Sequence, residues 1–301
     1  MRAYLSFFLK GLAMGAANVI PGVSGGTIAF ITGIYQKLID ALKSFDLVSL
    51  RLLISGKIKE FVLKTDLYFL IAIFLGIGIS ILSLARVLEY AFLNYEILTL
   101  AFFFGLIVAS IPGVGKQVSS YNIPNVVALI IGVAIAAGIA FLPPAESNAS
   151  FLYLLICGGV AICSMILPGL SGSYVLLLMG NYVLVMQAIS TLNFSIILPM
   201  ALGCLLGLVL FSRLLSFLFK NYQDLTISIL TGFVAGSLAI IWPWKETQYL
   251  VLESGKQKPT GYDWYFPELT VDFVYAVILM VIGFLLVWLM ERYANKVQTN
   301  S

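Results

Sequence analysis

"NVIPGVSGGTIAFITGIY", residues 18–35, interrupts the first long apolar stretch of the chain. Pro21 lacks the backbone donor that a helix interior needs, and the glycines that follow it are poor helix formers. Within lipid, such a break is tolerated only where protein or a cavity covers the freed backbone groups. We therefore predict that residues 4–36 form two helical arms that meet at Pro21. The favoured shape is a re-entrant hairpin with its tip inside the membrane, and the alternative is a pair of full spans.

The composition indicates the class of protein to which this break belongs. Of the 301 residues, 61% are hydrophobic and 10% are charged, and the mean hydropathy is +1.04. A soluble domain has about 25% charged residues, so we predict an integral membrane protein. The chain has no histidine, and its cysteines lie in apolar stretches. We interpret Cys157, Cys163 and Cys204 as small packing residues, and we expect no metal and no cofactor.

A second copy of the break lies in the other half of the chain. "PGLSGSY" at 168–174 repeats "PGVSGGT" at 21–27 with an offset of 147 residues. Further along, the agreement continues at an offset of 127, because the first half carries a long insert at 37–66. The matched pairs include Gly33 with Gly180, Tyr35 with Tyr182, Arg86 with Arg213, and the Asn-Tyr pairs at 94–95 and 221–222. The pattern predicts an internal duplication.

Each repeat is predicted to contain a broken block followed by three apolar blocks long enough to span a membrane. The fold class is therefore expected to be an all-α polytopic membrane protein with two repeats, 1–145 and 146–301. The first repeat holds the broken block 4–36, the insert 37–66 and the spans 67–92, 96–111 and 125–142. The second repeat holds the broken block 151–190 and the spans 194–218, 225–242 and 272–290.

The distribution of Lys and Arg predicts the orientation of the chain. With a cytoplasmic N-terminus, the inner segments hold 11 of these residues and the outer segments hold three. Each repeat crosses the membrane an odd number of times under either shape of the broken block. The second repeat is therefore expected to be inverted, with both termini in the cytoplasm. Inverted repeats with broken helices are typical of transporters, whose site lies near the midplane where the breaks meet.

Two long connections carry side chains suited to the membrane surface. Residues 37–66 mix six basic and four acidic residues with apolar ones. They predict an interfacial amphipathic helix on the cytoplasmic side, and a partner-binding element is the alternative. Residues 243–271 suit an outer aromatic belt or a cap over the mouth of the site. The aromatic residues there are Trp244, Tyr249, Tyr262, Trp264, Tyr265 and Phe266.

Three cations remain inside the predicted membrane region. Lys10 can extend along a hairpin arm to the cytoplasmic interface. Arg86 and Arg213 are equivalent under the repeat, and the inversion places one of them towards each leaflet. A charge within the membrane costs several kcal/mol, so both arginines are candidates for binding an anion. The alternatives are interfacial anchors and, for Arg86, a structural ion pair with Glu89.

The two hairpin tips supply donors that suit an anion. A helix start exposes unpaired N–H groups and the positive end of the helix dipole. Glycine lets a ligand approach the backbone, and hydroxyl groups add further donors, so we predict a phosphate site. Tight helix packing by small residues is the alternative. The predicted site residues are Ser24, Gly25, Gly26 and Thr27 at the first tip, and Ser171, Gly172 and Ser173 at the second.

A serine hydrolase is excluded by the residues that the chain lacks. Residues 22–26 fit the G-x-S-x-G pattern around a serine nucleophile, but such a serine needs a base, and the chain has no histidine. Lys10 would have to serve instead, and nothing in the sequence places it beside Ser24. No nucleotide-binding or metalloprotease motif occurs either. We therefore expect a protein that is not an enzyme and that does not bind nucleic acid.

The motifs resemble those of a known family. "GAANVIPGVSGGTIAFITGIYQKLI" at 15–39, with "PGLSGS" at 168–173, resembles the bacterial polyprenyl-phosphate transporter family, formerly a domain family of unknown function. The resemblance extends over essentially the whole chain. It implies translocation of undecaprenyl phosphate, the lipid carrier of cell-wall synthesis, from the outer to the inner leaflet. It also implies that the residues of the two tips recognise the lipid headgroup.

One position departs from the family pattern. The resemblance implies that an aspartate often occupies the position of Asn18, where this chain has no carboxylate. Proton coupling through that position is therefore not expected. The acidic residues that could take such a role instead are Glu89 and Glu96, while Asn18 is expected to give polar support.

These observations together predict a flippase of the bacterial cytoplasmic membrane with a polyprenyl-phosphate lipid as substrate. Arg86 would capture the headgroup from the outer leaflet, the tips would hold it near the midplane, and Arg213 would receive it towards the inner leaflet. The alternatives are a transporter or channel for a small soluble anion and a non-transporting membrane scaffold. The GxxxG pairs Gly203/Gly207 and Gly232/Gly236 are expected to pack inside the protein rather than in a dimer.

Overall fold

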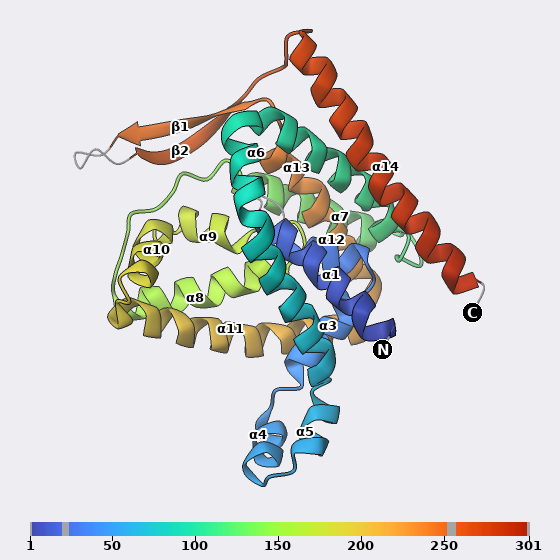
Figure 1. Ribbon diagram of the computed structural model, residues 1–301, viewed down its shortest axis with the longest axis vertical. Helices are drawn as coiled ribbons and strands as arrows, with labels where there is room; N and C mark the ends of the chain where they lie inside the picture. Colours follow the sequence, from blue (N-terminus) through green and yellow to red (C-terminus); the bar gives the residue numbers. More distant parts are fainter. Residues whose placement is uncertain (1, 20–23, 252–256, 300–301) are drawn as a thin grey trace. The chain divides into compact units, whose positions relative to one another are not determined.

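The computed structural model describes residues 2–19, 24–251 and 257–299 (Figure 1). The described chain is mostly helical and contains one two-stranded sheet. It divides into two compact units. Unit 1 comprises Met1–Arg86 and Ala145–Thr226, and unit 2 comprises Val87–Pro144 and Ile227–Ser301. Each unit therefore takes segments from both halves of the sequence.

In unit 1 the broken block of the first half forms three helices. They are α1 (Arg2–Val19), α2 (Gly25–Ile31) and α3 (Tyr35–Lys43). Pro21 itself lies outside the described residues. The second arm is interrupted again beyond the expected break, because Gly33 takes a φ of +71° that glycine adopts without steric cost. The seven residues of α2 therefore rise by only about 10 Å.

The broken block of the second half has the same helical layout. Its helices are α8 (Phe151–Ile166), α9 (Gly172–Leu178) and α10 (Tyr182–Ser190). The bounds of α9 and α10 equal those of α2 and α3 shifted by 147 residues. Gly180 takes a φ of +74°, and the chain bends by 114° between α9 and α10. The local backbone of the two broken blocks is therefore alike, including the second interruption.

The long helices that follow also share a kink. Helix α6 (Leu67–Gly115) begins in unit 1 and has a non-helical residue at Tyr95, with φ −143° and ψ 48°. Helix α11 (Phe194–Asn221) ends at Tyr222, with φ −139° and ψ 49°, where α12 (Gln223–Gly236) begins. Tyr95 and Tyr222 are the tyrosines of the matched Asn-Tyr pairs.

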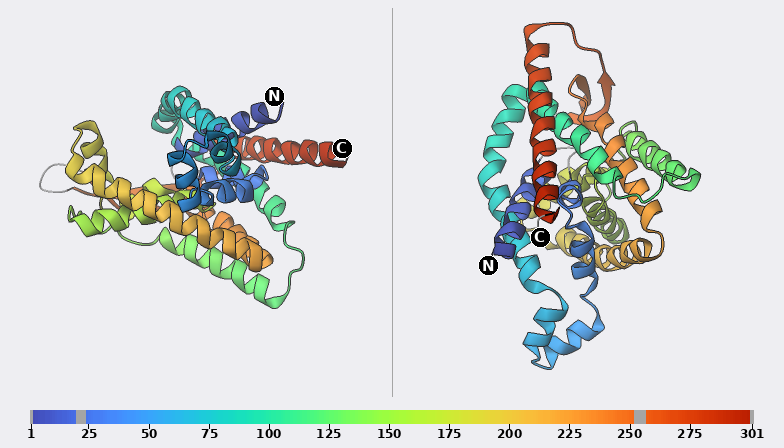
Figure 2. Two further views of the ribbon diagram at one scale, coloured as in Figure 1. Left: turned by 90° about the horizontal axis from the view of Figure 1, so that it is seen from below. Right: turned by 90° about the vertical axis from the view of Figure 1, so that its right-hand side faces the viewer.

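Glycines bring the helices of each unit into close contact. In unit 1, α8 and α11 lie side by side (Figures 1 and 2), and a Cβ atom at Gly203 would lie 2.0 Å from the carbonyl oxygen of Leu155. In unit 2, a Cβ atom at Gly232 would lie 2.2 Å from the carbonyl oxygen of Leu129. Small residues allow such backbone approach in membrane helices. The expectation that both GxxxG pairs pack inside the protein is confirmed.

The insert at 37–66 is not one continuous helix. It contains the end of α3, then α4 (Leu47–Ile54) and α5 (Ile58–Lys64), separated by Gly56 with a φ of +69°. In Figure 1, α4 and α5 extend as an arm beyond α3 and the start of α6. The arm exposes large apolar side chains, which suit a membrane surface. Its place at such a surface stays a prediction.

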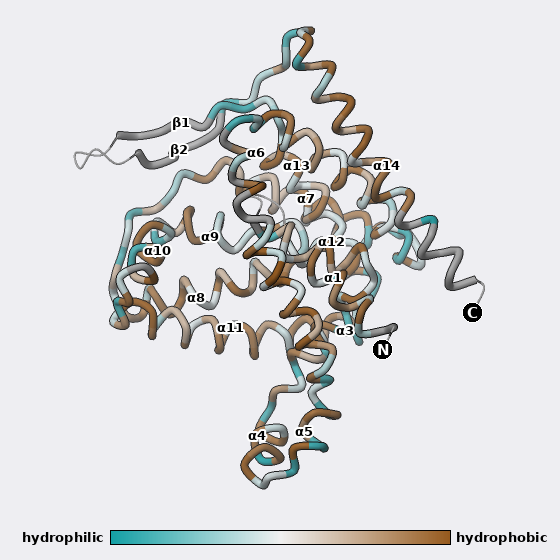
Figure 3. The backbone as a smooth tube through the Cα atoms, viewed as in Figure 1, coloured by the Kyte–Doolittle hydropathy of each residue, from teal (hydrophilic) through white to brown (hydrophobic). Residues whose placement is uncertain are grey.

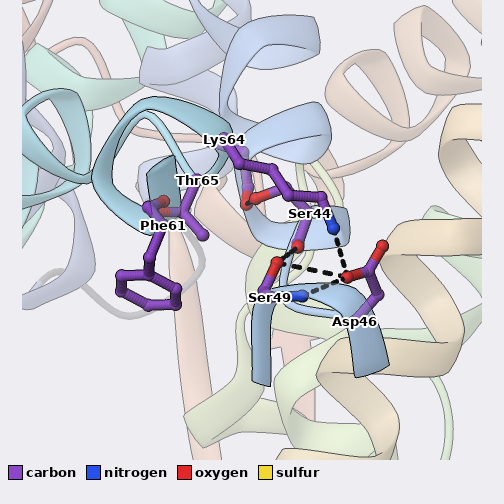
Figure 4. A network of polar contacts seen from close by, with 7 residues as sticks. Ser44, Asp46, Ser49, Phe61, Lys64 and Thr65 are labelled. Carbon is purple, nitrogen blue, oxygen red and sulfur yellow. Dashed lines mark hydrogen bonds and ion pairs between the residues drawn. The ribbon is translucent and has the colours of Figure 1, made fainter. Parts of the chain in front are cut away.

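One carboxylate joins the two helices of this arm (Figure 4). Asp46 caps α4 by accepting a hydrogen bond of 2.8 Å from the N–H of Ser49. The same carboxylate forms an ion pair with Lys64 at the end of α5. The hydrogen bonds and the positive charge lower the pKa of Asp46 from 3.8 to about 2.

Unit 2 contains the later part of α6, most of α12, α13 (Leu238–Ile241), α7 (Ile123–Ile139) and α14 (Val271–Thr299). It also contains an antiparallel pair of strands, β1 (Lys245–Val251) and β2 (Gln257–Trp264), which the sequence analysis did not predict. The indole N–H of Trp264 donates to the carbonyl of Ala239 at 2.9 Å. The aromatic segment at 243–271 is therefore partly a β-hairpin, and its place at the outer surface stays a prediction.

Within the described residues, four helices are long and apolar enough to cross a membrane, or up to six if each bent pair is one span. The four overlap the predicted spans 96–111, 194–218, 225–242 and 272–290. The span at 67–92 falls in α6, which qualifies there only together with α5, and the span at 125–142 corresponds to α7, which is shorter. Figure 3 shows apolar residues along α11 and α14. The protein is a multi-pass helical membrane protein.

Candidate functional site

The two sequence breaks meet inside unit 1. The hydroxyl of Ser24 lies 3.2 Å from the carbonyl oxygens of both Met165 and Leu167 and can donate to either. In the opposite direction, the N–H of Gly169 donates to the hydroxyl of Thr27 at 2.8 Å. The side chains of Ser24 and Thr27 are buried, with 2% and 1% exposed. The first tip, residues 24–27, is therefore bound directly to the second break.

Backbone contact between the two breaks requires glycine at one position. A Cβ atom at Gly26 would lie 2.4 Å from the carbonyl oxygen of Ile166. That distance is far inside van der Waals contact, and the obstacle is backbone rather than a flexible side chain. The close approach therefore depends on the missing side chain of Gly26.

At the first tip, the amide donors of α2 already have protein acceptors. The N–H of Gly25 donates to Asn18 Oδ1 at 2.7 Å, and the N–H of Gly26 donates to Ser24 Oγ at 3.1 Å. The N–H of Thr27 donates to the carbonyl of Ser24 at 2.9 Å. These donors were expected to be unpaired, and that expectation is wrong in this structure, because two side chains and one backbone carbonyl accept hydrogen bonds from them. A ligand that takes the Gly25 N–H must displace Asn18.

Asn18 therefore has a structural role that the sequence did not reveal. It lies in the last turn of α1 and reaches across the break to cap the start of α2. An amide oxygen caps without adding a charge, so the first tip stays neutral where a carboxylate would repel a phosphate. The expected polar support by Asn18 in ligand binding stays a prediction.

The second tip, residues 171–173, is arranged differently. The hydroxyls of Ser171 and Ser173 lie 2.9 Å apart and bond to each other. The side chain of Ser171 makes no capping hydrogen bond to α9, and Ser173 is exposed. A Cβ atom at Gly172 would lie 2.4 Å from Cγ of Met165, so an apolar side chain covers this glycine. Among the described residues, the hydroxyls of the second tip can turn to a ligand by giving up only their mutual bond.

The structure describes the charged candidate residues less completely than it describes the two tips. Arg213 is an exposed residue of α11, and within the described residues it makes no hydrogen bond or ion pair with either tip. Arg86 and Glu89 lie in α6, but the side chains of both lie outside the described part of the structure, and so does the ion pair weighed for them. Glu96 is exposed in unit 2. There its charge raises the pKa of Lys245, while the larger effect of burial lowers that pKa to about 8.

A polar contact between α3 and α11 was missed by the sequence analysis. The hydroxyl of Ser216 accepts from Lys43 Nζ at 2.9 Å and donates to Asp40 Oδ1 at 3.0 Å. Ser216 lies three residues after Arg213, which places the two side chains on neighbouring positions of α11. The charges at Asp40 and Lys43 were visible in the insert, but no local pattern links them to a serine that is more than 170 positions away.

Lys10 makes a contact within the protein that the sequence did not predict. Its ammonium group donates to the carbonyl of Thr32 at 2.8 Å, at the C-terminal end of α2. The end of a helix carries unpaired carbonyls and partial negative charge, which favour a cation. Lys10 therefore ties α1 to α2 in addition to any contact with the interface.

A multi-pass helical membrane protein whose two Pro/Gly breaks meet in one compact unit has features typical of transporters with discontinuous helices. The chain belongs to the undecaprenyl phosphate translocase-like family, whose model matches residues 14–258. It is similar to the polyprenyl-phosphate transporter of Vibrio cholerae, with 40% identity over 97% of this chain and 98% of the relative. A polyprenyl-phosphate transporter of Staphylococcus aureus is 30% identical over 78% of this chain and 85% of the relative. No solved structure matches the chain.

Proposed function

We propose that this protein is a polyprenyl-phosphate transporter that returns undecaprenyl phosphate from the outer to the inner leaflet of the bacterial cytoplasmic membrane. The lipid would then be available again for the synthesis of cell-wall polymers. The observation that carries the proposal is the hydrogen-bonded meeting of the two breaks, through Ser24 and through Thr27 with Gly169. The names of the relatives from two bacteria support the same substrate.

The proposed topology is two inverted repeats, each with a re-entrant broken block and three spans. Helices α2 and α9 have seven residues each and rise by about 10 Å, whereas the hydrocarbon core is about 30 Å thick. The chain turns at a glycine after each of them. Short helices followed by a turn support a hairpin over two full spans. The bias of Lys and Arg supports cytoplasmic termini.

The tips supply the chemistry that a phosphate monoester requires. Such a group accepts several hydrogen bonds, and charge-assisted bonds to its oxygens are the strong ones. The hydroxyls of Ser171 and Ser173 are the donors that become available to a ligand most easily. At the first tip, the headgroup would replace Asn18 on the N–H of Gly25 and gain the polar group of Thr27. The isoprenoid chain can stay in lipid while only the headgroup crosses.

The arginines give the path its two ends in this proposal. Arg86 would collect the headgroup from the outer leaflet, and Arg213 would receive it towards the inner leaflet. Both stand in the long helix that follows the insert or broken block of their own half. A guanidinium binds phosphate with two parallel hydrogen bonds, which lysine does not reproduce. The lipid crosses chemically unchanged, because the proposal includes no nucleophile or base.

The test is transport of undecaprenyl phosphate in proteoliposomes, with chromatography to show that the lipid stays intact. Arg213→Ala and Arg86→Ala are each expected to lower the rate at least tenfold, equivalent to about 1.4 kcal/mol. Arg213→Lys should recover only part of the rate. Wild-type rates in both alanine variants would contradict the proposed path.

Thr27→Val tests the tips, because it keeps the shape of the side chain and leaves the Gly169 N–H without its acceptor. Thr226→Val is the matched control, since the hydroxyl of Thr226 bonds only to the carbonyl of Tyr222 in its own turn at 2.7 Å. We expect Thr27→Val to slow transport and Thr226→Val to leave it unchanged. Equal behaviour of the two variants would remove the tips from the proposal.

A further inference from the structure

An apolar groove runs between α8 and α11 in unit 1. Its volume is about 480 Å³, which is within the range of about 300–1,000 Å³ for ligand pockets. Apolar residues of both helices line it, among them Ile156, Gly159 and Cys163 of α8 and Leu206, Leu210 and Leu214 of α11. No residue used for the headgroup contacts described above belongs to this lining.

The groove is deep because one of its glycines, Gly159, leaves the space of a side chain unfilled. A Cβ atom at Gly207 would lie 2.7 Å from the carbonyl oxygen of Gly159, so Gly207 is needed for the approach of the two helices. At Gly159 itself, the nearest atom to a Cβ would be the carbonyl oxygen of Gly203 at 3.5 Å, an ordinary van der Waals distance. Gly159 therefore leaves space in the groove that helix packing does not require.

The groove ends beside cations. Arg213 follows Leu206 by seven residues, so it lies two turns further along nearly the same face of α11, about 10 Å away. Lys220 continues that face by another seven residues, and both cations are exposed. On the neighbouring side, Lys43 and the carboxylate of Asp40 both bond to Ser216, so their charges offset each other there. An apolar groove that leads to the exposed cations Arg213 and Lys220 complements a molecule with an apolar chain and an anionic end.

We propose that this groove holds the first part of the isoprenoid chain of a polyprenyl phosphate while Arg213 binds its phosphate. The inference rests on the proposed function and adds the site that recognises the chain. Burial of apolar surface is non-directional, so the groove selects a flexible hydrocarbon chain, and Arg213 selects the charge at its end. A groove of about 16 Å along α11, from Gly203 to Leu214, seats only part of a long chain and leaves the remainder in lipid.

The experiment fills the groove without disturbing the helix contact. Gly159→Leu places a side chain in the open space. Gly78→Leu is the matched control, since Gly78 lies in α6 of the same unit and a Cβ there has nothing within 4 Å. Native mass spectrometry of the purified full-length protein measures binding of undecaprenyl phosphate and of isopentenyl phosphate. The second ligand carries one isoprene unit and therefore tests the phosphate contact with little of the chain.

Gly159→Leu is expected to weaken binding of undecaprenyl phosphate at least about tenfold, to leave binding of isopentenyl phosphate within about twofold, and to keep the wild-type melting temperature. Gly78→Leu should bind both ligands as the wild type does. A photoreactive group on the first isoprene units should crosslink to peptides of α8 and α11. Phosphatidylglycerol in excess should not remove that crosslink.

Wild-type binding of undecaprenyl phosphate by Gly159→Leu would overturn the proposal, and so would an equal loss for both ligands. Protection by phosphatidylglycerol would show that the groove holds ordinary lipid. A dimer that Gly159→Leu dissociates would show that it is an interface between copies. If the wild-type protein neither binds nor transports undecaprenyl phosphate, the proposed function itself fails. If the wild type does both and Gly159→Leu does too, only the groove assignment fails.

Discussion

The two tips have the same backbone layout but differ in what covers their helix starts. Helices α2 and α9 have equal lengths and begin directly after Ser24 and Ser171. At the first tip, Asn18 caps the helix. With the offset of 147 residues, the equivalent position is Met165, whose side chain lies over Gly172. A thioether is only a weak acceptor, so the second tip lacks the cap that the first one has.

The first tip is therefore held by contacts with the opposite break, whereas the second tip is free to rearrange its hydroxyls. The hydroxyls of Ser24 and Thr27 bond to the backbone of the opposite break, so moving the first tip breaks contacts between the two halves. The hydroxyls of Ser171 and Ser173 bond to each other, so moving them breaks one local contact. The two tips therefore share a backbone shape while their side chains make different contacts. Within the proposed function, the second tip is the one that opens first to a phosphate.

The largest expected effect comes from placing alanine at equivalent positions of the two tips. Gly26→Ala places a Cβ atom 2.4 Å from the backbone oxygen of Ile166 and should force the breaks apart. Overpacking of this kind costs about 1–3 kcal/mol, so we expect a lower melting temperature in detergent and a loss of transport. Ser173→Ala, at the matching position, should keep the wild-type melting temperature because Ser173 is exposed. Similar melting temperatures for the two variants would show that the tips are equally braced.

The next effect tests whether the cap causes the difference between the tips. Asn18→Met should uncap α2 and lower the stability by about 1 kcal/mol. Met165→Asn should cap α9 and weaken binding of undecaprenyl phosphate several-fold, because an acceptor then competes for the donors of the second tip. Melting curves and native mass spectrometry measure the two effects. Tighter binding by Met165→Asn would contradict the assignment of the second tip as the open one.

The sequence revealed the breaks and their pairing because both depend on local chemistry. Pro168 and Gly169 end α8 as the pattern predicts, and Thr27 meets Gly169 as expected for a site between two breaks. The cap by Asn18 was not predictable, because a helix start looks unpaired until the fold brings an acceptor to it. The link from Lys43 to Ser216 was missed for the same reason, since it depends on the packing of α3 against α11.

The smaller elements were predicted less well because several local patterns compete. Residues 37–66 have enough apolar and charged residues for one amphipathic helix, but Gly56 adopts a left-handed conformation that ends α4 before α5 begins. The strands of β1 and β2 lie in a segment whose aromatic residues suit a membrane interface equally well. In both cases the composition was informative, while the turn positions decided the structure.

The prediction with the smallest expected effect tests whether the insert, which only the first half carries, controls the first tip. The pKa of Asp46 is about 2 in the folded protein, below the ordinary value of 3.8, chiefly because Lys64 donates to it. Its contribution to stability is therefore present above about pH 3.8 and is lost as the pH falls through about 2. At pH 4.5, pepsin should cleave the α4–α5 arm of Asp46→Asn faster than that of the wild type. The two rates should converge near pH 2, and transport at neutral pH should be unchanged. A transport defect in Asp46→Asn would show that the insert takes part in transport, and would contradict this prediction.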